Sequence, residues 1–111
     1  MITRAEIGHW WRVARPFPIA SEAFWVGIFH DTVEDGYLPK ILLRWWPALD
    51  AMTRRDGEPY PDFIERAAAD LVARRVKLSD VRDNLSRNGG PPRQSLRERY
   101  EAALVVLDGA D

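Results

Sequence analysis

The 111-residue sequence contains no cysteine, so it can form neither a disulfide nor a thiolate metal site, and a reducing compartment is permitted. It has no apolar run near the roughly 20 residues that a membrane-spanning helix needs, and no signal-type apolar stretch at its start. We therefore expect a cytoplasmic protein that makes no membrane contact. The net charge of −1 implies no global attraction to nucleic acid, so no nucleic-acid polymer is expected as a partner.

Strand signals are also scarce, because no stretch alternates cleanly between apolar and polar residues. Apolar residues recur instead at helical spacing. Ser21 and Ser95 are predicted N-caps, Pro47 is predicted to kink or break a helix, and Gly36 is a predicted helix end. The predicted helices cover residues 3–14, 21–30, 38–53, a segment opening at 60–62, 71–85 and 95–107. We expect residues 1–111 to form one compact, all-α bundle of about six helices.

The five tryptophans are many for a chain of this length. They occur at positions 10, 11, 25, 45 and 46. One interpretation is that large aromatic side chains compensate for a small core, and the alternative is an exposed aromatic patch for a partner.

Four ionisable residues, His30, Asp31, Glu34 and Asp35, lie within six positions directly after an apolar segment. An imidazole nitrogen beside a carboxylate oxygen suits Mn²⁺, Fe²⁺ or Zn²⁺ better than Ca²⁺. Adjacent helical residues diverge by about 100°, so His30 and Asp31 can meet one ion only near a helix end, which Gly36 allows. The segment predicts a metal site beside an acid/base group, although an isolated His-Asp pair is usually a surface accident.

Two further segments bear on this site. Asp80 and Asn84 lie one turn apart on one predicted helical face, and Lys77 lies one turn earlier. His9, the only other histidine, precedes the His-Asp pair and is followed by Trp10. Taken alone, the first segment is an ordinary amphipathic helix with solvated charges, and the second is an ordinary packed histidine.

In chain order, His9, His30-Asp31 and Asp80 form an H…HD…D pattern, and on these residues the sequence resembles the HD-domain metal-dependent phosphohydrolases. It is most similar to the branch with the alarmone (guanosine tetraphosphate) hydrolases and their small stand-alone bacterial and phage relatives. The His-Asp-x-x-Glu-Asp motif of that branch is matched in full at 30–35. Its Val-Lys-Leu-Ala-Asp-x-x-x-Asn motif is matched at 76–84, with Ser79 in place of Ala. Stretches 53–66 and 96–100 are also similar, so the resemblance covers nearly the whole chain.

The resemblance implies one divalent ion, with Mn²⁺ favoured and Fe²⁺, Zn²⁺, Mg²⁺ or Co²⁺ as alternatives. It implies that the Glu34 and Asp35 carboxylates orient and deprotonate the attacking water, which agrees with the way a cation lowers the pKa of its water. The implied metal ligands are His9, His30, Asp31 and Asp80. The implied contacts to a nucleotide substrate are Asn84, Lys77, Arg66, Arg97 and Tyr100. For the last four of these, an exposed helix charge or a core tyrosine is the alternative interpretation.

The sequence also departs from the family pattern. Only about eight residues precede His9, so we expect an N-terminally shortened HD domain without the family's first helix and base-stacking loop. Trp10 follows His9 where the family has proline, and the stretch after Asp35 is shorter than usual. A pocket shortened in this way could be completed by a second copy of the chain, and the tryptophan pairs are the candidate residues for such a homodimer.

The function expected from these features is metal-dependent hydrolysis of a phosphate ester or pyrophosphate in a nucleotide. The alternative is a non-catalytic module that binds the metal or the nucleotide as a sensor, inhibitor or sponge. Glu34 and Asp35 favour the enzyme, because a binder needs no general base, whereas the missing N-terminal element favours the binder. A third interpretation is a structural remnant that holds no metal.

Overall fold

The computed structural model describes residues 3–19, 21–30, 43, 46–86 and 93–109, and the statements below refer to these ranges. Six helices and no strand occur within them, which confirms the expected all-α bundle. The helices are α1 (Arg4–Ala14), α2 (Glu22–Phe29), α3 (Pro47–Ala51), α4 (Tyr60–Ala68), α5 (Leu71–Ser86) and α6 (Gln94–Gly109).

The first two helices begin at side-chain caps. The Thr3 hydroxyl accepts a hydrogen bond from the Glu6 amide, and the Glu6 carboxylate accepts one from the Thr3 amide, which together form a capping box. Ser21 caps α2 by accepting from the Phe24 amide at 3.3 Å, as its position in the sequence predicts. These caps fix the starts of the two helices that provide the histidines.

One predicted helix boundary was wrong, and of the two alternatives predicted at Pro47, a kink or a break, the structure has the break. Trp46 has φ −138° and ψ 81°, which is not helical, so no continuous helix runs through it. A proline disfavours helical geometry in the residue before it but fits the first position of a new helix, and α3 accordingly begins at Pro47, which confirms the predicted break. Ser95 is not an N-cap, because α6 already begins at Gln94 and places Ser95 in the first turn. Gly36 lies outside the described residues.

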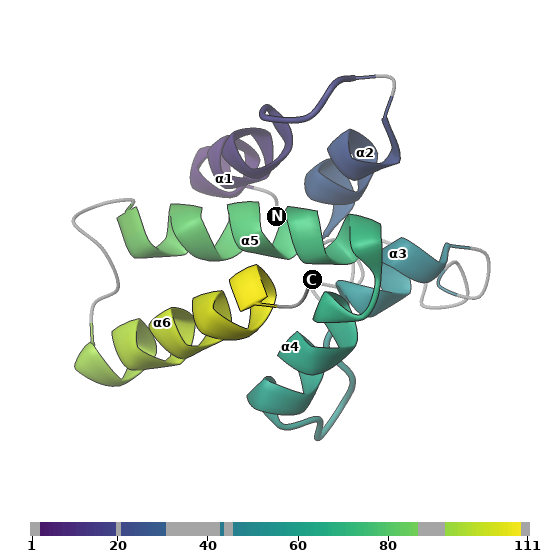
Figure 1. Cartoon of the computed structure of the whole chain (residues 1–111). Coiled ribbons are helices and arrows are strands. Elements are labelled where there is room, and N and C mark those ends of the chain that lie inside the picture. Colours follow the sequence, from purple (N-terminus) through teal and green to yellow (C-terminus); the bar gives the residue numbers. More distant parts are fainter. Residues whose placement is uncertain (1–2, 20, 31–42, 44–45, 87–92, 110–111) are drawn as a thin grey trace.

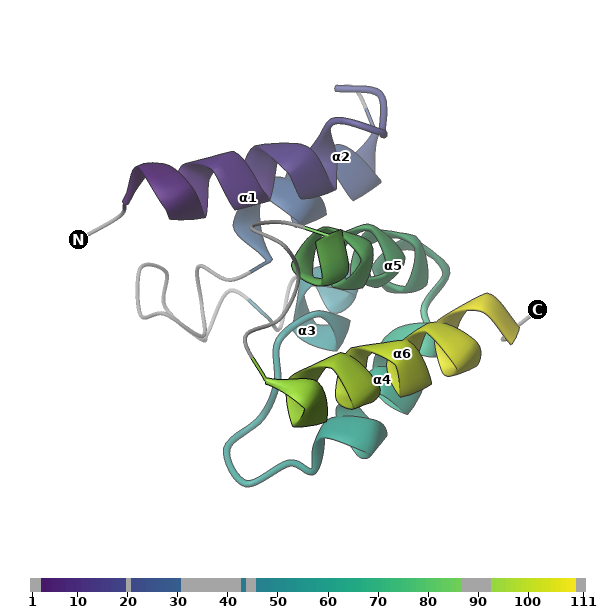
Figure 2. The ribbon, with the colours of Figure 1, turned by 90° about the vertical axis from the view of Figure 1, so that its left-hand side faces the viewer.

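Helix α5 occupies the centre of the bundle. Figure 1 shows it between α1 and α2 on one side and α4 and α6 on the other, and the rotated view of Figure 2 shows the same order. Val76 of α5 belongs to a buried cluster that includes Val13, Val26 and Leu49. One and a half turns later, Val81 belongs to a second buried cluster with α4 and α6. Because α5 packs into both clusters, its position is fixed from two sides.

Helices α1 and α2 lie close together at Gly27. A Cβ atom added to Gly27 would lie 2.9 Å from the Cα of Ala14, a backbone atom that cannot simply rotate away. Only glycine therefore allows this separation between the two helices. The separation matters for function, because α1 and the end of α2 each provide one histidine of the candidate site.

The described tryptophans are divided between core and surface. Trp10 is buried, as the core interpretation expects, whereas Trp11 and Trp25 are 50% and 43% exposed. Trp46 is half-buried, and its indole N–H donates to the Glu22 carboxylate at 2.9 Å. A homodimer through the exposed tryptophans stays a prediction. Among the described residues, no helix combines the length and hydrophobicity that crossing a bilayer requires.

Candidate metal centre

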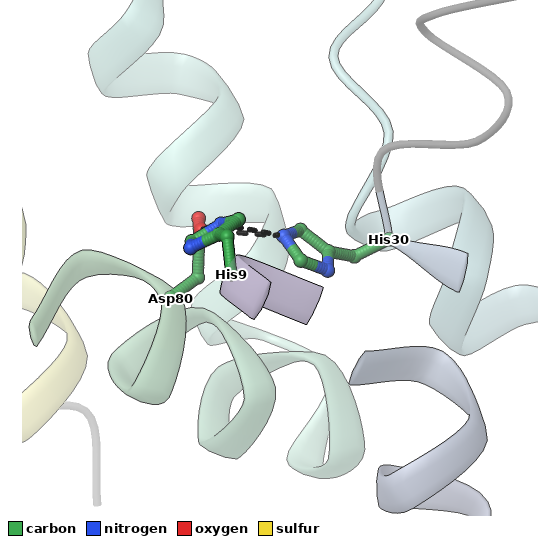
Figure 3. A group of neighbouring side chains, drawn as sticks. All are labelled: His9, His30 and Asp80. Carbon is green, nitrogen blue, oxygen red and sulfur yellow. Dashed lines mark hydrogen bonds and ion pairs between the residues drawn. The ribbon is translucent and has the colours of Figure 1, made fainter. Parts of the chain in front are cut away.

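Three side chains that are far apart in the sequence meet inside the bundle (Figure 3). His9 Nε2 lies 2.8 Å from Asp80 Oδ1, His30 Nε2 lies 3.3 Å from the same oxygen, and the two Nε2 atoms lie 3.2 Å apart. All three side chains are buried, with His30 only 1% exposed. Among the described residues this is the one group of histidine and carboxylate side chains with the spacing of a metal site.

Three helices bring these side chains together. His9 lies in the middle of α1, His30 is the residue that caps the C-terminal end of α2, and Asp80 lies on the central helix α5. The hydroxyl of Ser79 also donates to the Val13 carbonyl at 2.7 Å, which ties α5 to α1 beside the site. The position of His30 agrees with the expectation that the His-Asp pair needs a helix end to reach an ion.

The opposite nitrogen of each imidazole faces a hydrogen-bond acceptor. His9 Nδ1 lies 2.5 Å from Asp83 Oδ2, and His30 Nδ1 lies 2.6 Å from the Gly27 carbonyl oxygen. A carbonyl cannot donate and an ionised carboxylate does not, so both Nδ1 atoms carry a proton in the arrangement that satisfies these acceptors. A proton or a metal ion must then occupy the space where the two Nε2 atoms and Asp80 Oδ1 converge, and the group can supply three donor atoms to such an ion.

The donor set fits one divalent ion. Ligand atoms bound at roughly 2.0–2.2 Å, at octahedral or tetrahedral angles, lie about 2.8 to 3.6 Å apart. The three distances among the donor atoms, 2.8, 3.2 and 3.3 Å, lie within that range. Two imidazoles with one carboxylate suit Zn²⁺, Mn²⁺, Fe²⁺ or Co²⁺ and are a poor set for Ca²⁺, which prefers oxygen.

Lys77 compensates the charge of Asp80. Its buried ammonium donates to Asp80 Oδ2 at 2.7 Å and lies 4.7 Å from the centre of the Phe63 ring. Burial alone would raise the pKa of Asp80, but the charges of Lys77 and His30 and the histidine hydrogen bonds lower it well below its usual range. Asp80 is therefore ionised, with Lys77 at one oxygen and both histidines at the other.

Asp83 is a residue that the sequence analysis missed. Its carboxylate accepts from His9 on one oxygen and from Arg12 Nε, at 2.6 Å, on the other. Burial raises the pKa of Asp83, but the hydrogen bonds from Arg12 and His9 outweigh it and the pKa is lowered. A signal was present in the sequence, because Asp83 lies three residues after Asp80 and so on the same face of α5.

The predicted substrate contacts lie at different places. Asn84 adjoins the centre, with its amide 3.4 Å from Asp80 Oδ1. Tyr100 packs against the second core cluster, with its ring centre 6.4 Å from that of Tyr60. Arg97 lies on α6, where its nearest described acid is Glu101 at 3.9 Å. The structure thus places Asn84 and Lys77 at the centre, and it does not bring Tyr100 or Arg97 into contact with it.

Arg66 has a structural role in the described part of the chain. Its guanidinium donates to both carboxylate oxygens of Glu58, at 2.9 and 3.1 Å, and to the carbonyls of Asp50 and Thr53. The hydrogen bond from Arg66 lowers the pKa of Glu58 to about 2, against the opposing effect of burial. These bonds hold the loop before α4, so a contact between Arg66 and phosphate stays a prediction that the geometry does not favour.

The other half of the predicted site, Asp31, Glu34 and Asp35, lies outside the described residues, and its expected roles stay predictions. No family model matches the chain, and no curated protein matches it either. The resemblance to HD-domain phosphohydrolases accordingly rests on the motifs of the chain itself.

Proposed function

We propose that this protein is a divalent-metal-dependent phosphohydrolase of the HD type, acting on a phosphate ester or pyrophosphate of a nucleotide. The observation that carries the proposal is the buried meeting of His9 Nε2, His30 Nε2 and Asp80 Oδ1, with each imidazole oriented through its other nitrogen. In the H…HD…D sequence pattern, His9 is the first histidine, His30 is the histidine of the His-Asp pair, and Asp80 is the last aspartate. The pattern and the geometry therefore both support the proposal.

The residues of the chain would divide the work. His9, His30 and Asp80 would hold the ion, and Asp31 is proposed as the fourth ligand. Once bound, a divalent ion supplies a water of lowered pKa and neutralises charge on phosphoryl oxygens. Mn²⁺ is the favoured ion of this proposal.

The general base of the proposal is the Glu34–Asp35 pair. Neither described carboxylate near the histidines suits that role, because Asp80 is bonded to Lys77 and Asp83 to His9 and Arg12. A base must be able to accept a proton near neutral pH, and the pKa values of Asp80 and Asp83 are both lowered. Asn84, beside Asp80, is the proposed contact to the nucleotide.

The test has two parts on the same purified protein. Metal content is measured first, and phosphate release from a panel of nucleotides is then followed with Mn²⁺ added. We expect about one ion per chain and turnover of at least one nucleotide, both lost in His30→Ala. The Asp31→Ala/Glu34→Ala double variant should lose turnover while keeping the helical fold.

Two results would decide against the enzyme. Turnover that survives in the Asp31→Ala/Glu34→Ala variant would contradict the proposed chemistry. Nucleotide binding without turnover of any nucleotide in the panel would support the binding-module alternative instead. His30→Ala is best paired with Asp108→Ala, an exposed residue of α6, as a control for nonspecific loss.

A further inference from the structure

A groove rich in arginine lies on the side of His9 that faces away from the metal centre. It has a volume of about 500 Å³ and is bounded by the end of α1, the turn after it and one face of α5. Four arginines line it: Arg12 lies in α1, Arg15 directly follows α1, and Arg75 and Arg82 lie in α5. The chain as a whole has a net charge of −1, so this concentration of positive charge is local.

Most of this charge is not neutralised within the groove. The acid among the described lining residues is Asp83, and its two oxygens already accept from His9 and Arg12. Arg82 reaches the exposed Asp108 of α6 at 3.3 Å, in a pair that solvent screens. Within the described part of the chain, Arg15 and Arg75 have no acidic partner.

The two walls of the groove are fixed relative to each other. Arg12 bonds Asp83, His9 bonds Asp80 and Asp83, and the Ser79 hydroxyl bonds the Val13 carbonyl, each linking α1 to α5. A site whose walls are already cross-linked loses little conformational entropy when a ligand binds. The arginines are therefore presented from two directions on a preformed scaffold.

We propose that this groove binds a small polyphosphate anion, at a site separate from the metal centre. Guanidinium groups match phosphate oxygens in charge and in bidentate geometry, and several of them on opposite walls suit a chain of two or three phosphoryl groups. The volume lies within the range of small-molecule sites, roughly 300–1,000 Å³. Phe17, a half-buried lining residue, offers an aromatic surface for an attached base or other planar group.

The groove and the point where the metal ligands converge lie on opposite sides of the His9 imidazole. Asp83 stands between the two, with one oxygen on His9 Nδ1 and the other on Arg12. The metal ligands converge instead at the Nε2 atom of His9. The proposal therefore does not depend on the proposed catalytic function.

Calorimetric titration with inorganic tripolyphosphate, in the presence of EDTA, tests the site. EDTA removes any divalent ion, so binding through a metal is suppressed and the groove is measured alone. We expect saturable binding that weakens as NaCl is raised, and a loss of affinity of at least about tenfold in Arg15→Gln/Arg75→Gln. The control is Arg4→Gln/Arg93→Gln, which removes the same charge from exposed positions outside the groove and should retain affinity within about threefold.

Three outcomes would overturn the proposal. The first is that tripolyphosphate does not bind in the presence of EDTA. The second is an equal loss of affinity in the groove variant and in the control variant, which would reflect net charge alone. The third is tighter binding of a single-stranded oligonucleotide than of tripolyphosphate, lost in the same variant, which would make the groove a nucleic-acid surface. Circular dichroism of both variants checks that the helices are retained.

Discussion

Asp83→Asn is the substitution that most directly tests how the candidate centre is built. Asp83 does not belong to the group of converging donor atoms, but it accepts from His9 Nδ1 at 2.5 Å and from Arg12 at 2.6 Å. An asparagine keeps the shape and one acceptor oxygen, and it loses the negative charge. The imidazole of His9 then becomes less basic and less firmly oriented, so His9 should hold a metal ion less tightly.

The expected loss can be bounded from the contacts. Removing an outer partner of a metal-binding histidine typically costs 10- to 100-fold in metal affinity. The asparagine oxygen can still accept from Nδ1, and a neutral hydrogen bond has about half the strength of a charge-assisted one. We therefore expect the low end, about tenfold, which corresponds to about 1.4 kcal/mol.

Competition between the protein and a chromogenic chelator for Zn²⁺ or Mn²⁺ measures this change. The matched control is Asp108→Asn, which also removes a carboxylate paired with an arginine, Arg82, but at an exposed position of α6. Its metal affinity should equal that of the unmodified protein. An unchanged affinity in Asp83→Asn, with the thermal unfolding temperature preserved, would refute the inference that Asp83 orients a metal ligand.

Three further predictions concern charge and packing. Lys77→Met should destabilise the metal-free protein by about 3 kcal/mol in urea unfolding, because Asp80 loses its buried cation, while metal affinity rises because a competing positive charge is gone. Glu58, whose pKa is lowered to about 2 by Arg66, stabilises the fold above its ordinary pKa of 4.5 and loses this contribution as pH falls from there toward 2. Glu58→Gln should therefore remove roughly 1 kcal/mol of the pH-dependent stability, a modest amount because solvent screens part of the Glu58–Arg66 pair. Thermal unfolding measured between about pH 2 and pH 7 would detect this change. Gly27→Ala should cost about 1–3 kcal/mol in thermal unfolding and also weaken metal binding, because the added methyl forces α1 and α2 apart.

Each of these has a control or a contrary result. A fall in metal affinity in Lys77→Met would show that the ammonium supports the site rather than competing for it. For the acid dependence, Glu101→Gln is the comparison, because Glu101 is exposed and lies 3.9 Å from its arginine, so its profile should not change. For the helix contact, Gly109→Ala is the comparison, because open space surrounds that position and no loss of stability is expected.

The helices could be predicted from the sequence because their signals are local. The Ser21 cap, the break at Pro47 and the apolar spacing each act within about one turn, and the structure confirms them. The choice between a kink and a break at Pro47 is local as well, since a proline disfavours helical geometry in the residue before it, here Trp46. Ser95 shows the limit of such signals, because a good capping residue can equally occupy the first turn.

The meeting of His9, His30 and Asp80 is not a local property, and composition or periodicity alone could not have predicted it. It depends on α1 and α2 packing against the same side of α5, at a separation that Gly27 permits. The order of the motif residues along the chain carried the prediction instead. The order of the motif residues indicates which side chains form the site, but it says nothing about the residues that surround them.

The surroundings changed the interpretation of α5. Lys77, Asp80, Asp83 and Asn84 all lie on one face of this helix, and the sequence favoured a solvated charged side for it when it was taken alone. In the bundle that face lies against His9 of α1, His30 at the end of α2 and Phe63 of α4, so charges that would be nearly independent in water become partners of one another. Lys77, which was expected to contact phosphate, bonds Asp80, and Asp83, which the sequence analysis did not single out, bonds His9.

A helix face with this many charges can be buried only if each charge has a partner, and the two histidines, Lys77 and Arg12 supply these partners. The pairing that makes the face buriable also aims both imidazoles at one point, so the stability of the fold and the geometry of the candidate metal centre have the same origin.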